Sequence, residues 1–589
     1  MDRIAAAYAV GGWLFVQAAS IAFPAFDAPS WLLRWLIAAL VVGFPTVLIS
    51  VWLLKKPETE SWKLAHFRSR NAIFVSLVAL VAALTLAELA WHWSAGGAAL
   101  TGSKQANSAA PNSIAVLPFD NMSGDPRQRY FSEGISSELI GLLARNPALR
   151  VAARTSSFFF EGKEQDIRVI AQKLNVRAIL EGSVQSDGSH LHIETSLVNA
   201  ANGYQLWSQS YDRSLSDILT VQAQIAQSIA QALAPALTGA KASPQIPKPT
   251  QIDPQVYREY LQAQVYFDQR MSEQQTPESQ QAIDNSIALL RRVASAVPNF
   301  ADGQAALAQA LFVAQNDNEY AGQIQQAVSR ALALDPENPQ ALLVSMNVAA
   351  NNKDWDSAIA FAATLKRHSG HTAVGAEGLA EIYEDLYLNE QALAAYKEWA
   401  KLDPFSVDAW QGTARVNFAL AHYKDAIAAN DQALALHPDD PITREYKCVS
   451  LASLNQIDAA KAVLSEISRP GVPAPLASHC RFFITLHSQG AAPAVALVND
   501  ALAHDKDSLG PPGDVGFMLS HAGADDEAMD WYQKTYDNGG FLSGFYPGES
   551  TPAAFFQNPR WIAFTKQPGY QKREAARVRA LQVLGDNPS

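Results

Sequence analysis

Four carboxylate side chains recur along one stretch of the sequence at the spacing of a single helix face. They are Glu377, Glu381, Glu384 and Asp385, at positions i, i+4, i+7 and i+8. Carboxylates on one stripe repel one another, which costs stability unless a positive group lies opposite. Two interpretations stay open: a solvated charged face, which is common on exposed helices, and a site that attracts a cationic partner.

Other residues offer less support for chemistry. His190 and His192 have the spacing of a metal pair on one strand face, but no third ligand is implied and a hairpin turn lies beside them, so a solvated edge is favoured. His479, next to Cys480, is interpreted as a similar coincidence. The sequence contains no P-loop, GxGxxG, GxSxG or HExxH string. We therefore expect no catalytic residue, no cofactor and no metal, and we do not expect an enzyme.

Composition narrows the function classes further. A chain of 589 residues allows three or four folding units, and its formal net charge is −12. An acidic chain with no basic cluster outside the predicted membrane loop does not suit nucleic acid, whose phosphates require Lys and Arg. Cys448 and Cys480 match no CxxC spacing. They would pair in an oxidising compartment, but separate buried, apolar roles are favoured because connectivity cannot be deduced from spacing.

Three apolar runs near the start of the chain predict membrane spans. They are Ile4–Phe23, Trp31–Leu54 and Ala72–Trp91, within a membrane region over 1–93. Only Glu88 is charged in the third run, and a run of about 20 apolar residues is long enough to cross a bilayer. A buried core helix is the alternative for such a run.

The orientation of these spans follows from charge. The loop before the third run contains five basic side chains opposed by two glutamates: Lys55, Lys56, Lys63, Arg68 and Arg70. Short loops rich in Lys and Arg stay in the cytoplasm, so residues after about 94 are expected to face away from it. The first run lacks a small-residue cleavage site followed by a polar mature sequence, so we expect no cleavable signal peptide. A flexible linker is expected over 94–112.

Residues 113–239 have the pattern of a small α/β domain with a mixed sheet. IAVLPF at 114–119 predicts a buried strand, and helices are expected over Tyr130–Ala144 and Asp166–Leu174. Two turn signals, Asp187-Gly188 and Asn202-Gly203, separate three strand-like runs and predict an antiparallel meander. The last helix has apolar residues at helical spacing: Ile218, Val221, Ile225, Ile229 and Leu233.

A resemblance to a known family is carried by four strings in this order: SIAVLPFDNMSGDP, YFSEGI, VRAILEGSV and LWSQSYDR. Together they resemble the TolB amino-terminal-like domain of bacterial envelope proteins. The resemblance implies a non-catalytic periplasmic module, often preceded by a cytoplasmic DNA-binding or nucleotide-cyclase domain and followed by helical repeats. The strings AAAYAVGGWLFVQAAS and GFPTVLISVW are similar to the membrane region of the cyclase-associated members. We expect the first companion to be absent, because only three residues precede the first apolar run.

Beyond a Pro-rich linker over 240–254 the sequence repeats. Pro404 and Pro438 are 34 residues apart, and Pro336 lies 68 residues, or two periods, before Pro404. A 34-residue period is typical of tetratricopeptide repeats, so an all-α solenoid of roughly six to eight helix pairs is expected over 255–540. A capping segment and tail are expected over 541–589, where Pro552–Tyr570, with FFQNPRWIAF and Pro568, resembles the segment that often ends such arrays. In one unit, packing positions are expected at Leu379, Ala380, Tyr383, Ala392, Tyr396 and Trp399.

The resemblance to tetratricopeptide repeats also predicts where the stripe of four carboxylates, the acidic stripe, lies. Tetratricopeptide arrays line their concave surface with first-helix residues, which implies that Glu377, Glu381, Glu384 and Asp385 lie there. Arg415, at the corresponding position of the next repeat, is expected to neutralise them in part. Besides the solvated face, the hypothesis is a groove for a basic peptide or a Lys/Arg-rich segment of an envelope protein.

The expected fold class is therefore a multidomain membrane protein with three transmembrane helices, a small α/β domain and a tetratricopeptide solenoid. Its expected role is a periplasmic, protein-binding scaffold or sensor anchored in the bacterial inner membrane. The alternative is one component of a transmembrane signalling or adenylate-cyclase-type system whose cytoplasmic output domain is on another chain. A cyclase within this chain is disfavoured, since that chemistry needs metal-binding aspartates in a cytoplasmic domain of its own.

Overall fold

The computed structural model describes residues 112–163, 165–187, 190–233, 252–272, 277–314, 319–538 and 548–585, with the side chains of 270–272 left out. The chain divides into two compact units, 1–104 and 105–589, and every described residue belongs to the second. The expected membrane spans lie outside the described residues. Within these residues, no helix combines the length and the apolar character needed to cross a membrane.

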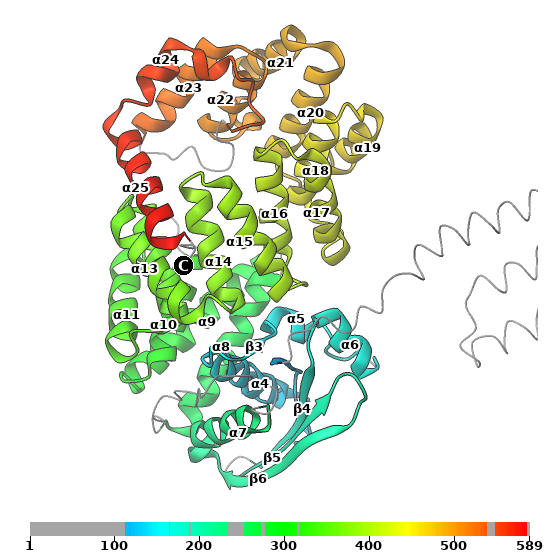
Figure 1. Ribbon diagram of the computed structural model, residues 1–589, viewed down its shortest axis with the longest axis vertical. Helices are drawn as coiled ribbons and strands as arrows, with labels where there is room; N and C mark the ends of the chain where they lie inside the picture. Colours follow the sequence, from blue (N-terminus) through cyan, green and yellow to red (C-terminus); the bar gives the residue numbers. More distant parts are fainter. Residues whose placement is uncertain are drawn as a thin grey trace, which may run out of the picture. The chain divides into compact units, whose positions relative to one another are not determined.

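The α/β domain is built on one mixed sheet in the order β3-β1-β4-β5-β6 (Figure 1). Parallel pairing joins β1 (Ser113–Val116) to β3 (Arg150–Val151) and to β4 (Ala178–Ser186). Antiparallel pairing joins β4 to β5 (His190–Asn199) and β5 to β6 (Gln205–Ser214), as the turn signals predicted. A two-residue strand that was not expected, β2 (Asp120–Asn121), pairs with β4.

Helices cover this sheet where apolar periodicity predicted them. α4 (Arg129–Ala144) and α7 (Ile218–Leu233) pack against each other and place their apolar residues in one core with the strands. α6 (Ile167–Leu174) begins at Asp166, whose side chain accepts a hydrogen bond from the Arg168 N–H, and ends at Asn175 with φ 52°. Both are ordinary helix-end signals. The short helix α5 (Arg154–Phe158) was not expected.

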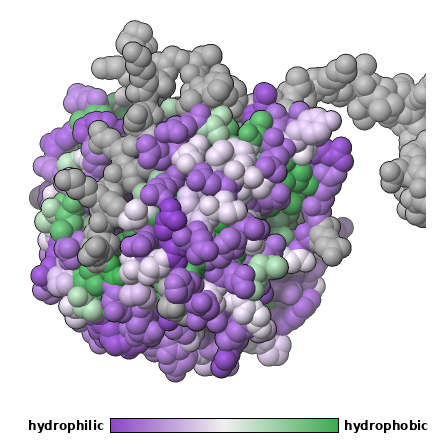
Figure 2. Space-filling model, turned by 90° about the horizontal axis from the view of Figure 1, so that it is seen from below, coloured by the Kyte–Doolittle hydropathy of each residue, from purple (hydrophilic) through white to green (hydrophobic). Residues whose placement is uncertain are grey.

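The molecular face seen from below Figure 1 is mainly hydrophilic. Figure 2 shows hydrophobic side chains there only as small separate groups on the coloured surface. On β6, the strand at one end of the sheet order, Tyr204 just before the strand and Leu206 within it are exposed. Scattered apolar residues of this kind are normal on a soluble surface. The coloured part of this face therefore offers no extended apolar patch for docking.

The rest of the described chain is helical and forms eight consecutive helix pairs, from α8 to α23. Their bounds are α8 (Pro254–Ser272), α9 (Pro277–Ala296), α10 (Ala301–Ala314), α11 (Ala321–Leu334), α12 (Pro339–Asn351), α13 (Trp355–Ser369), α14 (Ala373–Asp385), α15 (Asn389–Leu402), α16 (Val407–Ala419), α17 (Tyr423–Leu436), α18 (Pro441–Ser453), α19 (Ile457–Ile467), α20 (Ala474–Gln489), α21 (Ala491–His504), α22 (Pro512–His521) and α23 (Asp525–Asp537). The expected all-α repeat region is confirmed. Its expected packing residues Ala380, Tyr383 and Trp399 are buried.

Two local signals recur with the repeat period. The first helix of four successive pairs begins after a polar residue whose side chain accepts a hydrogen bond from the backbone N–H three residues later, which caps the helix: Asn338, Thr372, Ser406 and Asp440. The turn inside each of these pairs has one residue in the left-handed region, also spaced by 34: Lys353, Tyr387, Ala421 and Asn455. The 34-residue period is therefore visible in the capping and turn residues as well as in the spacing of apolar residues.

The α/β domain and the first helix pairs share one hydrophobic core. α8 packs on α4, where Leu261 is fully buried against Gly134: a Cβ at Gly134 would lie 2.8 Å from the Leu261 side chain. Tyr257 is also buried and accepts a hydrogen bond from Gln222 of α7, 2.8 Å away. The Pro-rich linker over 240–254 predicts that 113–239 and 255–589 fold with separate cores, and this prediction is wrong. The composition of the linker does not reveal that the following helix packs back onto the domain.

The loops that lead from one repeat to the next hold the α/β domain along a second contact. Asp335 forms an ion pair with Arg145 (2.7 Å), and His371 bonds through Nε2 to the Ala144 carbonyl (2.9 Å). The next loop in register provides Asp403, which accepts a hydrogen bond from the Ser156 hydroxyl. Its neighbour Phe405 stacks on Phe159, with ring centroids 4.0 Å apart. Three loops about one repeat apart therefore contact the same domain.

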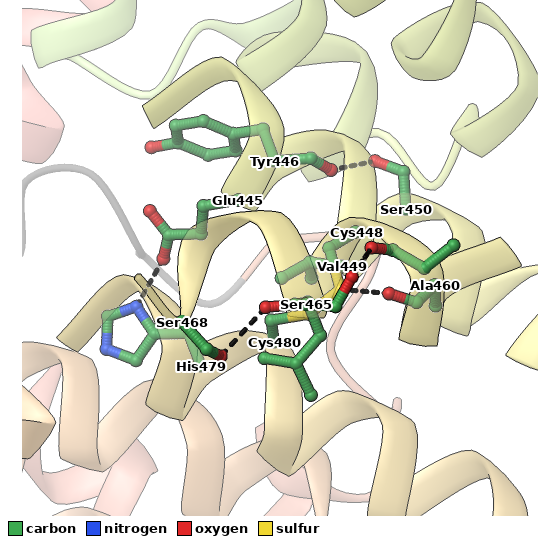
Figure 3. The surroundings of a disulfide bond; sticks show 12 residues. Glu445, Tyr446, Cys448, Val449, Ser450, Ala460, Ser465, Ser468, His479 and Cys480 are labelled. Carbon is green, nitrogen blue, oxygen red and sulfur yellow. Dashed lines mark hydrogen bonds and ion pairs between the residues drawn. A yellow bond between two sulfur atoms is a disulfide. The ribbon is translucent and has the colours of Figure 1, made fainter. Parts of the chain in front are cut away.

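The two cysteines form a disulfide, contrary to the favoured expectation of separate apolar roles. Cys448 lies in α18 and Cys480 in α20, the first helices of adjacent pairs, with Cα atoms 5.7 Å apart (Figure 3). Both side chains are fully buried. Helix packing brings them together across 32 residues of sequence, a relationship that the spacing of the cysteines did not reveal.

A fragment comprising 112–233 alone is expected not to fold cooperatively. Without α8 it exposes the surface that covers Tyr257, Tyr260 and Leu261. Burial of one large apolar side chain contributes about 1.5–3 kcal/mol. Three such contacts approach the whole stability of a small domain, about 5–15 kcal/mol. Near-ultraviolet circular dichroism and urea unfolding measure the outcome.

The matched fragment is 112–334, which adds α8 to α11 and contains every buried residue of the shared core except Val344. It is expected to unfold in one cooperative transition and to keep a native near-ultraviolet spectrum. If 112–233 shows the same spectrum and the same cooperativity, the α/β domain is independent of the repeats after all.

Candidate functional site: an acidic pocket among the repeat helices

A pocket of about 480 Å³ lies among the first helices of successive repeats. Pockets of about 300–1,000 Å³ are the size that binds small molecules or single side chains of a partner. Its walls come from α10, α12, α14, α15, α16, α18 and α22, from the turn between α14 and α15, and from one residue after the array: Phe312, Asn347, Asn351, Glu381, Glu384, Asp385, Tyr387, Asn389, Tyr396, Arg415, Val416, Phe418, Ala419, Tyr446, Phe517 and Ser550.

The structure brings four of the five predicted site residues into this pocket. Glu381, Glu384 and Asp385 occupy the last turns of α14, and Arg415 enters from α16. The register explains the meeting: Asn347, Glu381 and Arg415 stand at equivalent positions in three successive repeats. The Asn347 amide donates a 3.0 Å hydrogen bond to Glu381. Packing of the repeats thus stacks equivalent polar side chains beside one another.

Arg415 neutralises one carboxylate. Its Nε and Nη2 atoms donate hydrogen bonds to the two oxygens of Glu384 at 2.5 and 2.7 Å. The Tyr396 hydroxyl donates a third, at 2.5 Å. Burial by itself raises the pKa of Glu384, but attraction to Arg415 and these hydrogen bonds outweigh it, so the pKa is lowered. Glu384 is therefore a firmly ionised, structurally engaged group.

Glu381 and Asp385 are in a different state. Burial raises the pKa of Glu381 to about 7. The hydrogen bond from Asn347 opposes this shift, and the repulsion of neighbouring carboxylates adds to it. Burial and the charge of Glu384 raise the pKa of Asp385 to about 7, although Arg415 opposes the shift. No cation among the described residues forms an ion pair with either side chain. Both groups would gain from a positive charge placed in the pocket.

Glu377 stands apart from this pocket. It lies one helical turn before Glu381 on α14 and is not part of the pocket wall. Burial raises its pKa well above the ordinary value, and the nearby charges of Glu381, Asp408 and Asp403 add to the shift. Asp403 belongs to the loop that touches the α/β domain. The stripe therefore runs from the pocket toward that domain rather than along one wall.

The aromatic walls of the pocket were not predicted. Tyr387, Tyr446 and Phe418 line it together with Phe312 and Phe517. A sequence signal existed for Tyr387, because it occupies the left-handed turn position of its repeat, where a bulky residue is uncommon. No comparable signal pointed to Phe312 or Phe517, which reach the pocket from repeats distant in sequence.

The geometry suits the binding of an organic cation. Carboxylates accept hydrogen bonds from ammonium and guanidinium groups, and the faces of tyrosine and phenylalanine rings attract the same cations. This pocket combines both features, with several aromatic walls and two carboxyl groups that form no ion pair with a cation in the described part of the chain. Partner binding by Glu377, Glu381, Glu384, Asp385 and Arg415 stays a prediction.

The three histidines considered as candidates for chemistry each lie near an acidic side chain. His190 and His192 are exposed on β5, where they lie 3.7 Å from Asp187 and 3.5 Å from Glu194. His479 is buried, with Nδ1 2.5 Å from Glu445 and Nε2 3.1 Å from the Leu509 carbonyl. Figure 3 shows this histidine close to the disulfide. Within the described ranges, no three His, Cys, Asp or Glu side chains are grouped to hold a metal ion.

Comparison with known proteins covers only part of the chain. No family model matches it. A protein of Rhizobium meliloti (strain 1021), named "Putative adenylate cyclase 3", is 42% identical over 148 residues, which is 25% of this chain. The chain spans a quarter of the length of that relative.

Among solved structures, the helices are similar to a tetratricopeptide repeat protein from Parabacteroides merdae ATCC 43184. The TM-score is 0.29 at 15% identity, over 43% of this chain and 98% of that one. The human IFIT1 dimer with PPP-AAAA has a TM-score of 0.31 at 12% identity, over 54% of this chain and 79% of that one. Similarity this low carries no argument about function, and the repeat architecture rests on the helix pairs and the 34-residue turn signals of this chain.

Asp385→Asn is expected to raise the melting temperature at pH 8. The folded-state pKa of about 7 lies above the unfolded value of about 3.9, so the native chain loses stability as pH rises between these values. A neutral amide does not suffer this loss. The gain should shrink as pH falls from 8 to 5 and vanish near pH 4, as thermal unfolding at each pH will show.

Glu384→Gln is the matched control and has the opposite sign. The pKa of Glu384 is lowered, so its contribution to stability is present at neutral pH and is lost only when pH falls below about 4. This variant should melt at a lower temperature at pH 8, because Arg415 loses its partner. Equal gains for Asp385→Asn at pH 4 and pH 8 would show that its effect is not electrostatic.

Proposed function

We propose that this chain is a membrane-anchored binding protein whose repeat helices capture a basic segment of a partner protein. One observation carries the proposal: Glu381 and Asp385 face an aromatic-walled pocket while the nearby arginine is held by Glu384. A lysine or arginine side chain entering the pocket would supply the missing charge. The role is binding rather than catalysis.

Several features support a periplasmic location. A buried disulfide persists in oxidising compartments and is rare in the bacterial cytoplasm. The three apolar runs and the basic loop between the second and third are those of an inner-membrane anchor with its following domains outside the cytoplasm. The resemblance of 113–239 to TolB-like periplasmic modules agrees with this orientation.

A second candidate function is a part in a cyclase-linked signalling system, with the output domain on another chain. The relative named as an adenylate cyclase favours it, over the quarter of each chain that matches. The shared core offers a physical route, because repeats that bind a partner also hold the α/β domain through Asp335, His371 and Asp403. A ligand that shifts these loops would move the domain.

Binding of a fluorescein-labelled lysine-rich peptide tests the proposed function. The full chain should bind it and not a glutamate-rich peptide of equal length, with an affinity that falls as salt rises. Asp385→Asn and Glu381→Gln should each weaken binding roughly tenfold, or about 1.4 kcal/mol. Fluorescence anisotropy gives both affinities.

Glu390→Gln is the control, since Glu390 is an exposed carboxylate on the same repeat outside the pocket and its loss changes the net charge equally. Its affinity should equal that of the native chain. Equal losses in all three variants would mean that overall charge, not the pocket, attracts the peptide.

Fusion of a reporter enzyme that is active only outside the cytoplasm tests the orientation. A fusion after Asn112 should be active and a fusion after Glu60 silent, because the latter lies in the basic loop. Both fusions should be present in similar amounts on immunoblots. The reverse pattern of activity would place the repeats in the cytoplasm and remove the periplasmic assignment.

A further inference from the structure

The last described helix returns from the end of the repeats to their middle. α25 (Pro568–Leu584) follows α24 (Pro559–Phe564) and packs on α13 (Figure 1). Three residues on one face, Ala576, Ala580 and Leu584, are almost completely buried among side chains of α12 to α16. The Leu584 carbonyl accepts hydrogen bonds from Lys366 (2.7 Å) and Tyr383 (2.9 Å). α25 therefore has a defined seat more than 200 residues away in sequence.

α25 is also a basic helix in an acidic chain. It contains Lys572, Arg573, Arg577 and Arg579 against a single acidic residue, Glu574. Arg579 forms an ion pair with Asp356 of α13. The Arg573 guanidinium carbon lies 4.0 Å from the centroid of the Tyr387 ring, and Arg573 is only 6% exposed. The chain thus already places one of its own cations on an aromatic ring of the repeats.

Tyr387 connects this seat to the acidic pocket. The same side chain that lies under Arg573 is part of the pocket wall, two residues after Asp385. Its φ of 53° is unfavourable for a bulky residue, and equivalent turns in neighbouring repeats carry Lys353, Ala421 and Asn455 instead. Tyr387 is the wall residue that a partner cation and α25 would both contact.

We propose that α25 is an intramolecular competitor of the basic partner, which controls access to the acidic pocket through Tyr387. While α25 is seated, Arg573 lies over the ring of one wall residue, Tyr387, and its positive charge repels a second basic segment. Because α25 belongs to the same chain, its effective concentration is high, and a partner binds only to the fraction of molecules in which the helix has left. This inference rests on the proposed function of the pocket.

The first arm of the test removes the cation from Tyr387. In the full chain, Arg573→Ala should bind the labelled lysine-rich peptide about five- to tenfold more tightly than the native protein. Arg577→Ala is the matched control: it removes an equal charge from the same helix, but Arg577 pairs with Glu574 of α25 itself. Its affinity should stay within about twofold of the native value. Thermal unfolding checks that both variants are folded.

The second arm holds α25 in its seat without removing an arginine from Tyr387. In Asp356→Cys/Arg579→Cys, both new thiols stand at exposed positions, whereas the native cysteines are buried in their disulfide. A bismaleimide that joins the two thiols should weaken peptide binding at least tenfold. The same variant alkylated with N-ethylmaleimide, which leaves α25 untethered, should bind at least as tightly as the native chain.

These outcomes distinguish the competitor proposal from the proposed function of the pocket. Tighter binding by Arg573→Ala together with loss on cross-linking supports the competitor. Native affinity in both arms, with binding still weakened by Asp385→Asn, overturns the competitor and leaves the pocket as the partner site. If none of these chains binds the peptide, Arg573→Ala included, the proposed function fails and the competitor fails with it.

Discussion

The packing of α8 against α4 and α7 is the contact on which the rest of the described structure depends. A glycine at position 134 favours it, because a Cβ there would lie 2.8 Å from the Leu261 side chain and force it to shift. The packing also carries two buried polar pairs, Gln222 with Tyr257 and Glu138 with Tyr260, which fix the orientation of α8. Since each repeat packs mainly on its neighbours, the position of the first helix pair determines where the following pairs lie. That position then brings the loops at Asp335, His371 and Asp403 to the α/β domain.

The acidic pocket shows how a folded array tolerates charges that the isolated helix would not favour. Carboxylates at one helix end repel one another, and partial burial makes their ionisation more costly. The structure relieves one of them through Arg415 and leaves Glu381 and Asp385 with pKa values of about 7. The pocket is therefore poised between neutral and charged states near neutral pH, and a bound cation would shift it to the charged state. Binding and protonation are linked by the same interaction.

Two ties add to the packing between neighbouring repeats. The disulfide cross-links the adjacent repeats at α18 and α20, and α25 returns to α13 and α14 from more than 200 residues away in sequence. The contact made by α25 joins parts of the array that would not meet through neighbouring repeats alone. Each tie is close to one residue of the pocket wall: Tyr446 lies in α18 with Cys448, and the ring of Tyr387 contacts Arg573 of α25.

The sequence by itself determined the repeat period, the acidic stripe and most of the described element types, with β2 and α5 as exceptions. Alternating residues and Asx-Gly turns are sufficient for the meander of β4 to β6, and the caps at Asn338, Thr372, Ser406 and Asp440 recur because each helix needs its first N–H groups satisfied. Only the tertiary structure decided which groups meet. The pairing of Cys448 with Cys480, the core shared with α8, the aromatic wall and the seat of α25 all join residues distant in sequence. Their proximity depends on the crossing angles between all the successive helices taken together. Local sequence patterns carry no information about this accumulated rotation.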